Sequence, residues 1–272
     1  MDIPGRFTIL GESGSGKTCY LLGMYNKMRN HVAGYTVIAE DTSKGDMLFK
    51  LQYNYEDVLS FVWIDYPGAY LEPSKRDLNS ADYQAVEKYI NESDVLFICI
   101  DGANFVEGDI NDKIDAVETK CTANISPYLG TLIGKLRNEG KTLPPIAMIV
   151  TKYDMCESYI DTNELRNVIE EVFTPLFGKD DTYVAIIPVS LGKLNKDNRG
   201  VLQPRDIHLP ILFGIKFALL GRIAFENSQI QKIKTDITKK VKNTIILQMH
   251  APKNLLKNQD FFFLEVAVKL IA

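Results

Sequence analysis

Short apolar runs alternate with amphipathic stretches along most of the chain. Runs rich in β-branched and aromatic residues, bounded by turn residues, predict buried strands. These runs lie at 6–10, 35–39, 59–68, 93–101, 145–154 and 182–190. Between them, apolar residues three or four positions apart predict helices at 19–28, 79–91, 124–138, 161–177 and 207–225. This alternation is typical of an α/β protein whose mostly parallel sheet is covered by helices on both faces.

Two segments within this pattern are less regular. Residues 41–51 carry mixed signals, and we expect a short helix there, capped by Thr42 or Ser43. Residues 106–120 are polar and are expected to form an insertion at the rim of the sheet. Asp101, which ends the apolar run 93–101, is expected to cap that strand end.

The chain becomes basic after residue 227. Between 228 and 257, seven lysines stand against one acidic residue, Asp236. A helix here would carry one apolar stripe, formed by Ile230, Ile233, Ile237 and Val241. We expect a solvated helix docked on the core or on a partner, and a membrane surface or nucleic acid is the alternative partner. The apolar tail at 261–272 should pack as a strand or be covered by a partner.

Length and composition suit a globular protein with a sizeable core. The chain has 272 residues, of which 46% are hydrophobic, and a formal net charge of −4. That length allows one large domain or one domain with an appendage. We expect a domain at 1–226 and a basic helical and apolar extension at 227–272. The mild acidity gives no general argument for nucleic acid, although a sum can hide a local patch.

The cysteines and the N-terminal residues bear on the compartment. Four scattered cysteines, Cys19, Cys99, Cys121 and Cys156, form no C-x-x-C pair, so we expect reduced thiols. The sequence has no secretory pattern at its start and no apolar run long enough to span a bilayer. These features predict a cytoplasmic protein.

The turn between the strand at 6–10 and the helix at 19–28 carries the strongest motif. It reads Gly11-Glu12-Ser13-Gly14-Ser15-Gly16-Lys17-Thr18, which satisfies every fixed position of the phosphate-loop pattern G-x-x-x-x-G-K-[ST]. The glycines let successive N–H groups face a phosphate, and the positive end of the helix adds to the attraction. Lys17 would reach the β- and γ-phosphates of a nucleotide, and the Thr18 hydroxyl would bind Mg²⁺. We expect this loop and the following Cys19 to bind a nucleotide; a glycine turn that only joins strand to helix is the alternative.

A second motif ends the apolar run at 59–68. It reads Asp65-Tyr66-Pro67-Gly68. An aspartate at the carboxyl end of a strand beside the phosphate loop can hold Mg²⁺ through water. Gly68 lets a backbone N–H approach the γ-phosphate closely. We favour this function over an ordinary turn.

A third motif, Thr151-Lys152-Tyr153-Asp154, ends the run that starts at Pro145. G-x-x-x-x-G-K-T, D-x-x-G and T-K-x-D, in this order and each after a strand, resemble the P-loop GTPases of the Ras-like and translation-factor class. The D-Y-P-G and T-K-Y-D forms are most similar to bacterial stand-alone or double-GTPase domains. The resemblance covers about residues 6–193.

The resemblance implies which residues recognise the base. In that class the last aspartate of the third motif accepts hydrogen bonds from guanine, so Asp154 would select guanine over adenine, with the stem of Lys152 packed on the base. Ser190-Leu191-Gly192-Lys193 resembles the S-A-K loop whose backbone N–H groups meet the guanine carbonyl, and only Ser190 matches outright. Ser190 and Leu191 would therefore bind the base. The alternative for Asp154 is a cap of the loop before the helix at 161–177.

The resemblance also implies the fold and the reaction. It predicts a three-layer P-loop NTPase (Ras-like) domain with a mostly parallel sheet, which binds GTP or GDP and Mg²⁺ at the carboxyl ends of the strands. Catalytic contacts with the transferred phosphoryl group would come from Lys17, Thr18, Asp65 and Gly68. The protein would hydrolyse GTP slowly to GDP and phosphate and act as a switch on a protein partner or effector. Residues 36–52 and 68–80 would change order with the γ-phosphate.

The chain departs from that class at two positions, and one expected residue of the class is not found. Thr151 stands where the class usually has asparagine, and Ala69 stands where Ras-like enzymes have the glutamine that orients the attacking water. The switch threonine is unassigned, because Thr36 and Thr42 both fit better as strand or cap residues. None of the three histidines, at positions 31, 208 and 250, lies near these loops in the sequence. We therefore expect slow hydrolysis, or a water positioned by backbone, by another residue or by a partner.

Three other functions remain open from the sequence. An ATP-dependent phosphotransferase or motor would make T-K-x-D a coincidence. A nucleotide-bound interaction module without turnover would account for Ala69. An adaptor for lipid or nucleic acid would act through the lysine stretch.

Overall fold

A seven-stranded sheet organises the protein. The computed structural model describes residues 5–40, 47–65, 84, 88, 90–122, 126–139, 143–177, 183–192 and 203–249. The strands are β1 (Gly5–Leu10), β2 (Tyr35–Glu40), β3 (Met47–Tyr53), β4 (Glu56–Asp65), β5 (Val95–Asp101), β6 (Ile146–Thr151) and β7 (Val184–Pro188). Their order in the sheet is β2-β3-β4-β1-β5-β6-β7. β4, β1, β5, β6 and β7 run parallel, while β3 is antiparallel to both β2 and β4. The predicted α/β class and mostly parallel sheet are confirmed.

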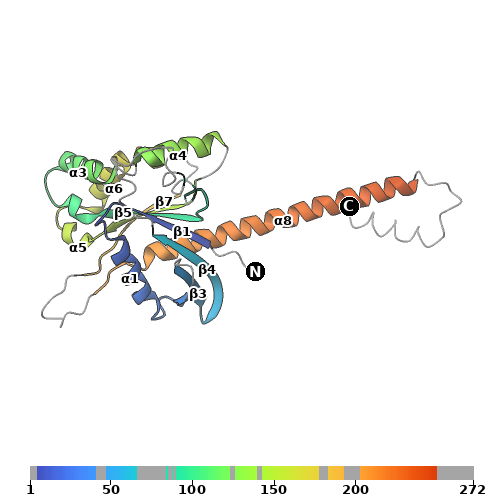
Figure 1. Cartoon of the computed structure of the whole chain (residues 1–272), viewed down its shortest axis with the longest axis horizontal. Coiled ribbons are helices and arrows are strands. Elements are labelled where there is room, and N and C mark those ends of the chain that lie inside the picture. The colour runs from blue at the N-terminus through green and yellow to red at the C-terminus, as the bar shows by residue number, and fades with distance from the viewer. Residues whose placement is uncertain are drawn as a thin grey trace. The chain divides into compact units, whose positions relative to one another are not determined.

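The described helices cover this sheet and extend beyond it. They are α1 (Lys17–Met28), η3 (Gly102–Phe105), α3 (Ile110–Val117), η4 (Glu118–Thr122), α4 (Ser126–Asn138), α5 (Tyr153–Cys156), α6 (Thr162–Val172), α7 (Thr174–Phe177) and α8 (Leu209–Met249). α3, α4 and α6 lie on one side of the sheet and α1 lies on the other (Figure 1). Of the helix predicted at 79–91, the described residues 84, 88, 90 and 91 are helical and the others lie outside the described residues.

The central strands have apolar side chains on both faces, and the core has two halves as a result. On β5, Leu96, Ile98 and Ile100 belong to the cluster that includes α4 and α6. The alternate residues Val95, Phe97 and Cys99 belong to the cluster that includes α1 and the first turns of α8. Successive side chains of a strand point to opposite faces, so a continuously apolar strand is buried between two helical layers. This arrangement is the expected three-layer α/β fold.

The short helix predicted within 41–51 is wrong for residues 47–51, because the chain there forms part of β3. Phe49 and Leu51 are buried while their neighbours are less so, which is the two-residue period of a strand. Asn54 and Tyr55, both with positive φ, turn the chain tightly from β3 into β4. Residues 41–46, including Thr42, lie outside the described residues.

The polar stretch at 106–120 is helical from Ile110 onward, where it forms α3 and the start of η4. Asp109 begins α3 with a capping box, in which its carboxylate accepts the N–H groups of Asn111 and Asp112 and the Asp112 carboxylate accepts the N–H of Asp109. A D-x-x-D cap ahead of Ile114 and Val117 is the sequence signal for this helix. The helix predicted at 161–177 is also confirmed in outline, but it is divided at Phe173 into α6 and α7.

The two C-terminal helical segments predicted from sequence are one continuous helix, α8. The chain divides into two compact units, Met1–Leu219 and Leu220–Ala272. In the second unit Ile230, Ile233 and Ile237 are each about half exposed, and Lys232, Lys234 and Lys239 are exposed. The domain boundary at residue 226 remains a prediction. Nowhere in the described residues does a helix combine the length and the apolar character needed to cross a membrane.

Candidate functional site

A cavity of about 730 Å³ lies at the carboxyl ends of β1, β6 and β7. Three loops that are far apart in the sequence line it. The expected site residues among its lining are Ser13, Gly14, Gly16, Lys17, Thr18, Cys19, Lys152, Asp154, Ser190 and Leu191. Gly11, Glu12 and Ser15 belong to the same first loop without lining the cavity. The structure therefore brings three segments together: the first motif, the third motif and the loop from Ser190 to Gly192, which we call the serine loop.

The loop from Gly11 to Thr18 has the backbone conformation that its glycines permit. Gly14 and Gly16 have φ of 82° and 89°, in the left-handed region where only glycine is unstrained. A Cβ on Gly11 would lie 2.6 Å from Ser15 Oγ, so a side chain there would displace the loop. α1 begins after Gly16 without a side-chain cap. The positive end of its dipole therefore faces the cavity, where it favours an anion.

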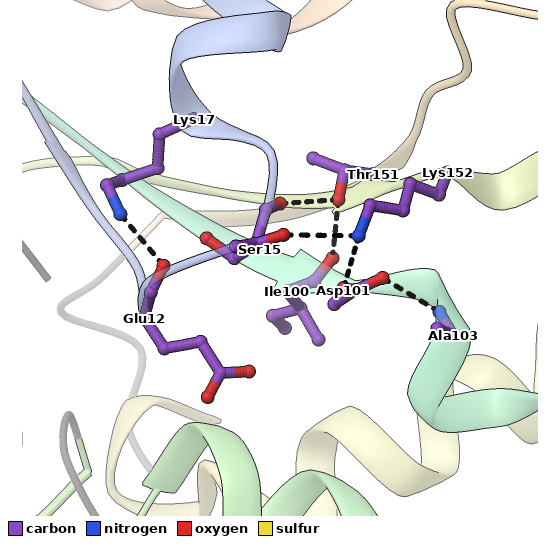
Figure 2. Close-up of polar contacts among 9 residues, drawn as sticks. Glu12, Ser15, Lys17, Ile100, Asp101, Ala103, Thr151 and Lys152 are labelled. Carbon is purple, nitrogen blue, oxygen red and sulfur yellow. Dashed lines mark hydrogen bonds and ion pairs between the residues drawn. The ribbon is translucent and has the colours of Figure 1, made fainter.

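Lys17 is buried, and its ammonium group is held by the loop itself. Lys17 Nζ donates to the carbonyl oxygen of Gly11 at 2.7 Å. It also donates to that of Glu12 at 2.9 Å (Figure 2). The Ser15 hydroxyl is fully buried and has no hydrogen-bond partner among the described residues. These contacts fix a positive charge next to the uncapped helix end, which is the electrostatic environment that an anionic ligand needs.

Thr151 and Lys152 connect the loop after β6 directly to the phosphate loop. Thr151 Oγ1 donates to the carbonyl oxygen of Ser15 at 2.6 Å and lies 3.2 Å from that of Ile100. Lys152 Nζ donates to the carbonyl oxygen of Gly14 at 3.1 Å. Figure 2 shows both side chains reaching the same turn of the phosphate loop. The threonine that replaces the usual asparagine thus still binds the phosphate-loop backbone.

Asp154 lies in the first turn of α5 and lines the cavity. Its carboxylate is partly buried and forms no hydrogen bond or ion pair with any other described residue. The helix that follows, α6, is capped by Asp161, whose carboxylate accepts the N–H groups of Asn163 and Glu164. Asp154 is therefore available to a ligand in the cavity. The alternative role of Asp154, a cap of the loop before this helix, stays a prediction.

Backbone hydrogen bonds with Arg205 hold the serine loop in place. Ser190 and Arg205 exchange two backbone hydrogen bonds, N–H to carbonyl oxygen, of 3.2 and 2.9 Å. The Arg205 guanidinium forms an ion pair with Glu157 at 2.5 Å, which raises the pKa of Arg205, and it lies over the Tyr153 ring. Because the Ser190 N–H is already used, Leu191 and Gly192 carry the backbone groups that can face a ligand here.

Glycines allow the wall beside this loop to pack closely. Gly192 has φ of 83°, and a Cβ on it would lie 2.7 Å from the Gln203 carbonyl oxygen. Gly23, on α1, faces Leu191: a Cβ there would overlap Leu191 Cδ2 and lie 2.7 Å from Ile207 Cδ1. Leu191 and Ile207 both line the cavity. α1 therefore contacts the wall of the cavity directly.

The second motif is described only in part. Asp65 ends β4 and pairs in register with Ile9 of β1, one strand from the phosphate loop, but its side chain and all of Gly68 and Ala69 lie outside the described residues. Thr18 is exposed at the cavity. Within the described part of the chain, no group of three or more His, Cys, Asp or Glu side chains could hold a metal ion. The Mg²⁺ ligands Thr18 and Asp65 stay predictions.

Of the two candidate switch threonines, Thr36 is not among the residues that line the cavity, and Thr42 lies outside the described residues. Thr36 lies in β2, where its hydroxyl is hydrogen-bonded to His31 Nδ1 at 3.0 Å, as expected for a strand residue. Most of the segment 36–52 that was expected to change order forms the paired strands β2 and β3. That this segment changes order with the γ-phosphate stays a prediction. The segment 68–80 lies outside the described residues.

The cysteines differ in environment. Cys19 is exposed at the cavity, while Cys99 and Cys156 are buried, and all three are free thiols. Burial raises the pKa of Cys156 to about 11. Burial also raises the pKa of the Tyr20 phenol, on the first turns of α1, well above its usual value.

Neither the scan of protein-family models nor the search of curated proteins found a match for the chain. Among solved structures, the FeoB G-domain from Methanococcus jannaschii is 17% identical with a TM-score of 0.39, covering 80% of this chain and 98% of that one. The SRb-GTP/SRX complex of the signal recognition particle receptor from Chaetomium thermophilum contains a chain that is 14% identical with a TM-score of 0.42, covering 70% and 92%.

A GTP-binding protein from Sulfolobus solfataricus, solved with GDP, is 15% identical with a TM-score of 0.42; the match covers 79% of this chain and 53% of that one. The chain thus spans about half the length of the Sulfolobus protein. The assignment of this chain to the α/β P-loop fold rests on its own sheet order and phosphate-loop geometry.

Proposed function

We propose that the protein binds GTP and GDP in this cavity and hydrolyses GTP slowly to GDP and phosphate, as a switch. The supporting observation is the meeting of three loops on one cavity: the phosphate loop, the T-K-x-D loop and the serine loop. The first would take the phosphates and the other two would take the base. A phosphate turn alone would not need a partly buried, unpaired carboxylate more than a hundred residues away in sequence.

The base preference follows from the hydrogen-bonding groups of the cavity. A carboxylate only accepts hydrogen bonds, and guanine offers two donors on the edge that Asp154 would meet. Adenine offers no matching pair of donors there, so a carboxylate removed from water would lose its partners. Asp154 would therefore favour guanine over adenine.

Hydrolysis would depend on positioning and on electrostatics. The N–H groups at the start of α1 and the Lys17 ammonium would stabilise the negative charge that develops on the transferred phosphoryl oxygens. Mg²⁺, held by Thr18 and through water by Asp65, would neutralise charge on the β- and γ-phosphates. Water would be the nucleophile, and with Ala69 in place of glutamine its orientation is left to other groups, which accounts for a slow rate.

Calorimetric titration with GTP, GDP and ATP tests the binding proposal. We expect guanine nucleotides to bind at least about tenfold more tightly than ATP, because an unpaired buried carboxylate costs about 1–3 kcal/mol. Asp154→Asn should weaken GTP and improve binding of xanthosine triphosphate, whose 2-oxygen accepts the amide N–H of the new side chain. Asp115→Asn, at an exposed position on α3, is the control. Tighter binding of ATP than of GTP by the natural protein would refute the guanine assignment.

Release of phosphate tests turnover separately. Lys17→Ala should abolish it, while Lys27→Ala, an exposed lysine in the last turn of the same helix, should leave it unchanged. Binding of GTP without any phosphate release would support the non-hydrolysing module in place of the GTPase.

A further inference from the structure

We infer that Asp101 is a positioning residue of the base site, which sets the direction of Lys152. The inference rests on the proposed nucleotide site and adds a residue to it. Asp101 ends β5, and its partner in register on β6 is Thr151, the first residue of the third motif. The carboxyl ends of these two strands thus place an aspartate beside the T-K-x-D loop.

The Asp101 carboxylate is oriented by the backbone that follows it. Oδ1 accepts the N–H of Ala103 at 2.9 Å, as the cap of η3. This bond fixes the carboxylate plane and leaves Oδ2 directed at Lys152, whose Nζ lies 2.5 Å away (Figure 2). The side chain of Asp101 is 18% exposed, so the pair is partly removed from water and its attraction is less screened than at an open surface.

The backbone next to Asp101 and at Lys152 allows the ion pair between these two residues to form. A Cβ at Gly102 would overlap the Thr151 carbonyl oxygen and lie 2.9 Å from that of Lys152, so glycine allows the two loops to touch. Lys152 itself has φ of 50° and ψ of 33°, a left-handed conformation that is costly for a lysine. The left-handed backbone and the ion pair together direct the side chain toward Asp101 at the end of β5, although 40% of the Lys152 side chain stays exposed.

Lys152 Nζ therefore forms hydrogen bonds with two different parts of the structure, the end of β5 and the phosphate loop. It donates to Asp101 Oδ2 and to the Gly14 carbonyl oxygen of the phosphate loop. Held at both points, the four-carbon stem of Lys152 is fixed along the wall of the cavity that Asp154 also lines. Without Asp101 the stem would regain rotamer freedom, and a base packed on it would have to order it again on binding.

The experiment measures the affinity of the full-length chain for GDP with Mg²⁺ by calorimetry, together with the melting temperature. Asp101→Asn keeps an oxygen for the Ala103 N–H and removes the charge that holds Lys152. We expect GDP to bind about fivefold to tenfold more weakly, with little change in melting temperature. Asp109→Asn is the matched control, since Asp109 also caps a helix through Oδ1 but is exposed on α3.

A double-mutant cycle identifies the route of the effect. If Asp101 acts through Lys152, Asp101→Asn should cost nothing further in a Lys152→Ala background. An equal loss in both backgrounds would overturn the inference, as would an unchanged affinity in the single variant. Should Asp101→Asn fail to fold, Asp101→Ser, which also caps well but cannot reach Lys152, takes its place. A natural protein that binds no GDP would refute the proposed function, whereas tight GDP binding that is indifferent to Asp101 would refute only this inference.

Discussion

At the scale of single residues, Thr151 shows how a departure from a motif can keep its structural role. The hydroxyl donates to the Ser15 carbonyl oxygen from a fully buried position, a bond that an asparagine amide could also make. The proposed guanine preference would not depend on this residue, because Thr151 contacts the phosphate-loop backbone and Asp154 lines the cavity.

Thr151→Val tests that bond. Valine has nearly the same shape but no hydroxyl, so the Ser15 carbonyl would lose its short bond. We expect the free energy of unfolding to fall by about 1–2 kcal/mol and the affinity for GDP to fall with it, measured by urea denaturation and calorimetry. Thr174→Val, whose hydroxyl bonds exposed carbonyls on α6, is the control and should change GDP affinity little. An unaltered affinity for Thr151→Val would contradict the role assigned to Thr151.

Cys19 offers a second test at this scale, because it is exposed where the nucleotide would lie. Alkylation by iodoacetamide near about pH 8 should modify Cys19 readily, and GDP with Mg²⁺ should slow this modification severalfold. Cys156 should stay unmodified in the native protein under both conditions, since burial raises its pKa to about 11 and excludes the reagent. Peptide mass spectrometry distinguishes the two sites. Equal rates for Cys19 with and without GDP would contradict its place in the nucleotide site.

The sequence was sufficient to predict many of the residues that line the cavity, but not Tyr20, Met155, Val189 or Ile207, and not the contacts among the residues. Gly11–Thr18 and Thr151–Asp154 are contiguous motifs, and their residue types alone indicate phosphate binding and base recognition. Asp101 carries no such pattern, since an aspartate at a strand end is common, and its contact with Lys152 depends on the pairing of β5 with β6. Likewise the fixing of Ser190 by Arg205 joins two segments that only the fold brings together.

At the scale of elements, the errors of prediction have local causes. β3 has only Phe49 and Leu51 as buried residues, and Lys50 between them forms ion pairs with Glu40 and Asp57, so the run looks polar from its sequence. α3 was not predicted as a helix because its first turn is acidic and only Lys113 and Val117 in it are buried. The strongly apolar strands β5 and β6 were predicted well because both of their faces are buried, and no surface residue interrupts their pattern.

Two glycines, Gly192 and Gly134, differ in backbone conformation and surroundings, and together they test the serine loop. Gly192→Ala would force an alanine into a left-handed backbone against the Gln203 carbonyl, so we expect a loss of about 1–2 kcal/mol in stability and weaker GDP binding. Gly134→Ala, in α4 with open space around the new methyl group, should stabilise the protein by about 0.5–1 kcal/mol. Thermal unfolding and calorimetry measure both. If Gly192→Ala bound GDP normally, the loop from Ser190 to Gly192 would not touch the base.

At the scale of the whole molecule, every described residue that lines the cavity lies in the unit Met1–Leu219. We propose that nucleotide binding needs only the domain at 1–226. A chain ending at residue 226 keeps Ile211, Ile215 and Ala218, the buried residues of the first turns of α8. It should bind GDP within about twofold of the full chain. A much weaker affinity would show that residues after 226 contribute to the site.

The same pair of chains tests the exposed lysines of α8. Contact with anionic lipid vesicles or with nucleic acid, if it occurs through Lys232, Lys234 and Lys239, should weaken steeply as salt is raised. It should also be lost in the chain that ends at 226. Co-sedimentation at two salt concentrations measures this, and binding that persists at high salt or in the shortened chain would exclude the lysines as its cause.

The close packing at Gly23 would couple the site for the phosphates of a bound nucleotide to the site for its base. Because residue 23 has no side chain, α1 packs directly against Leu191 and Ile207, which line the cavity. A displacement of α1 along its axis, such as the gain or loss of one phosphate could cause, would be passed by direct contact to the purine end. A methyl group added at position 23 would push α1 away from Leu191 and Ile207. A larger residue there should therefore alter the phosphate end and the purine end of the site together.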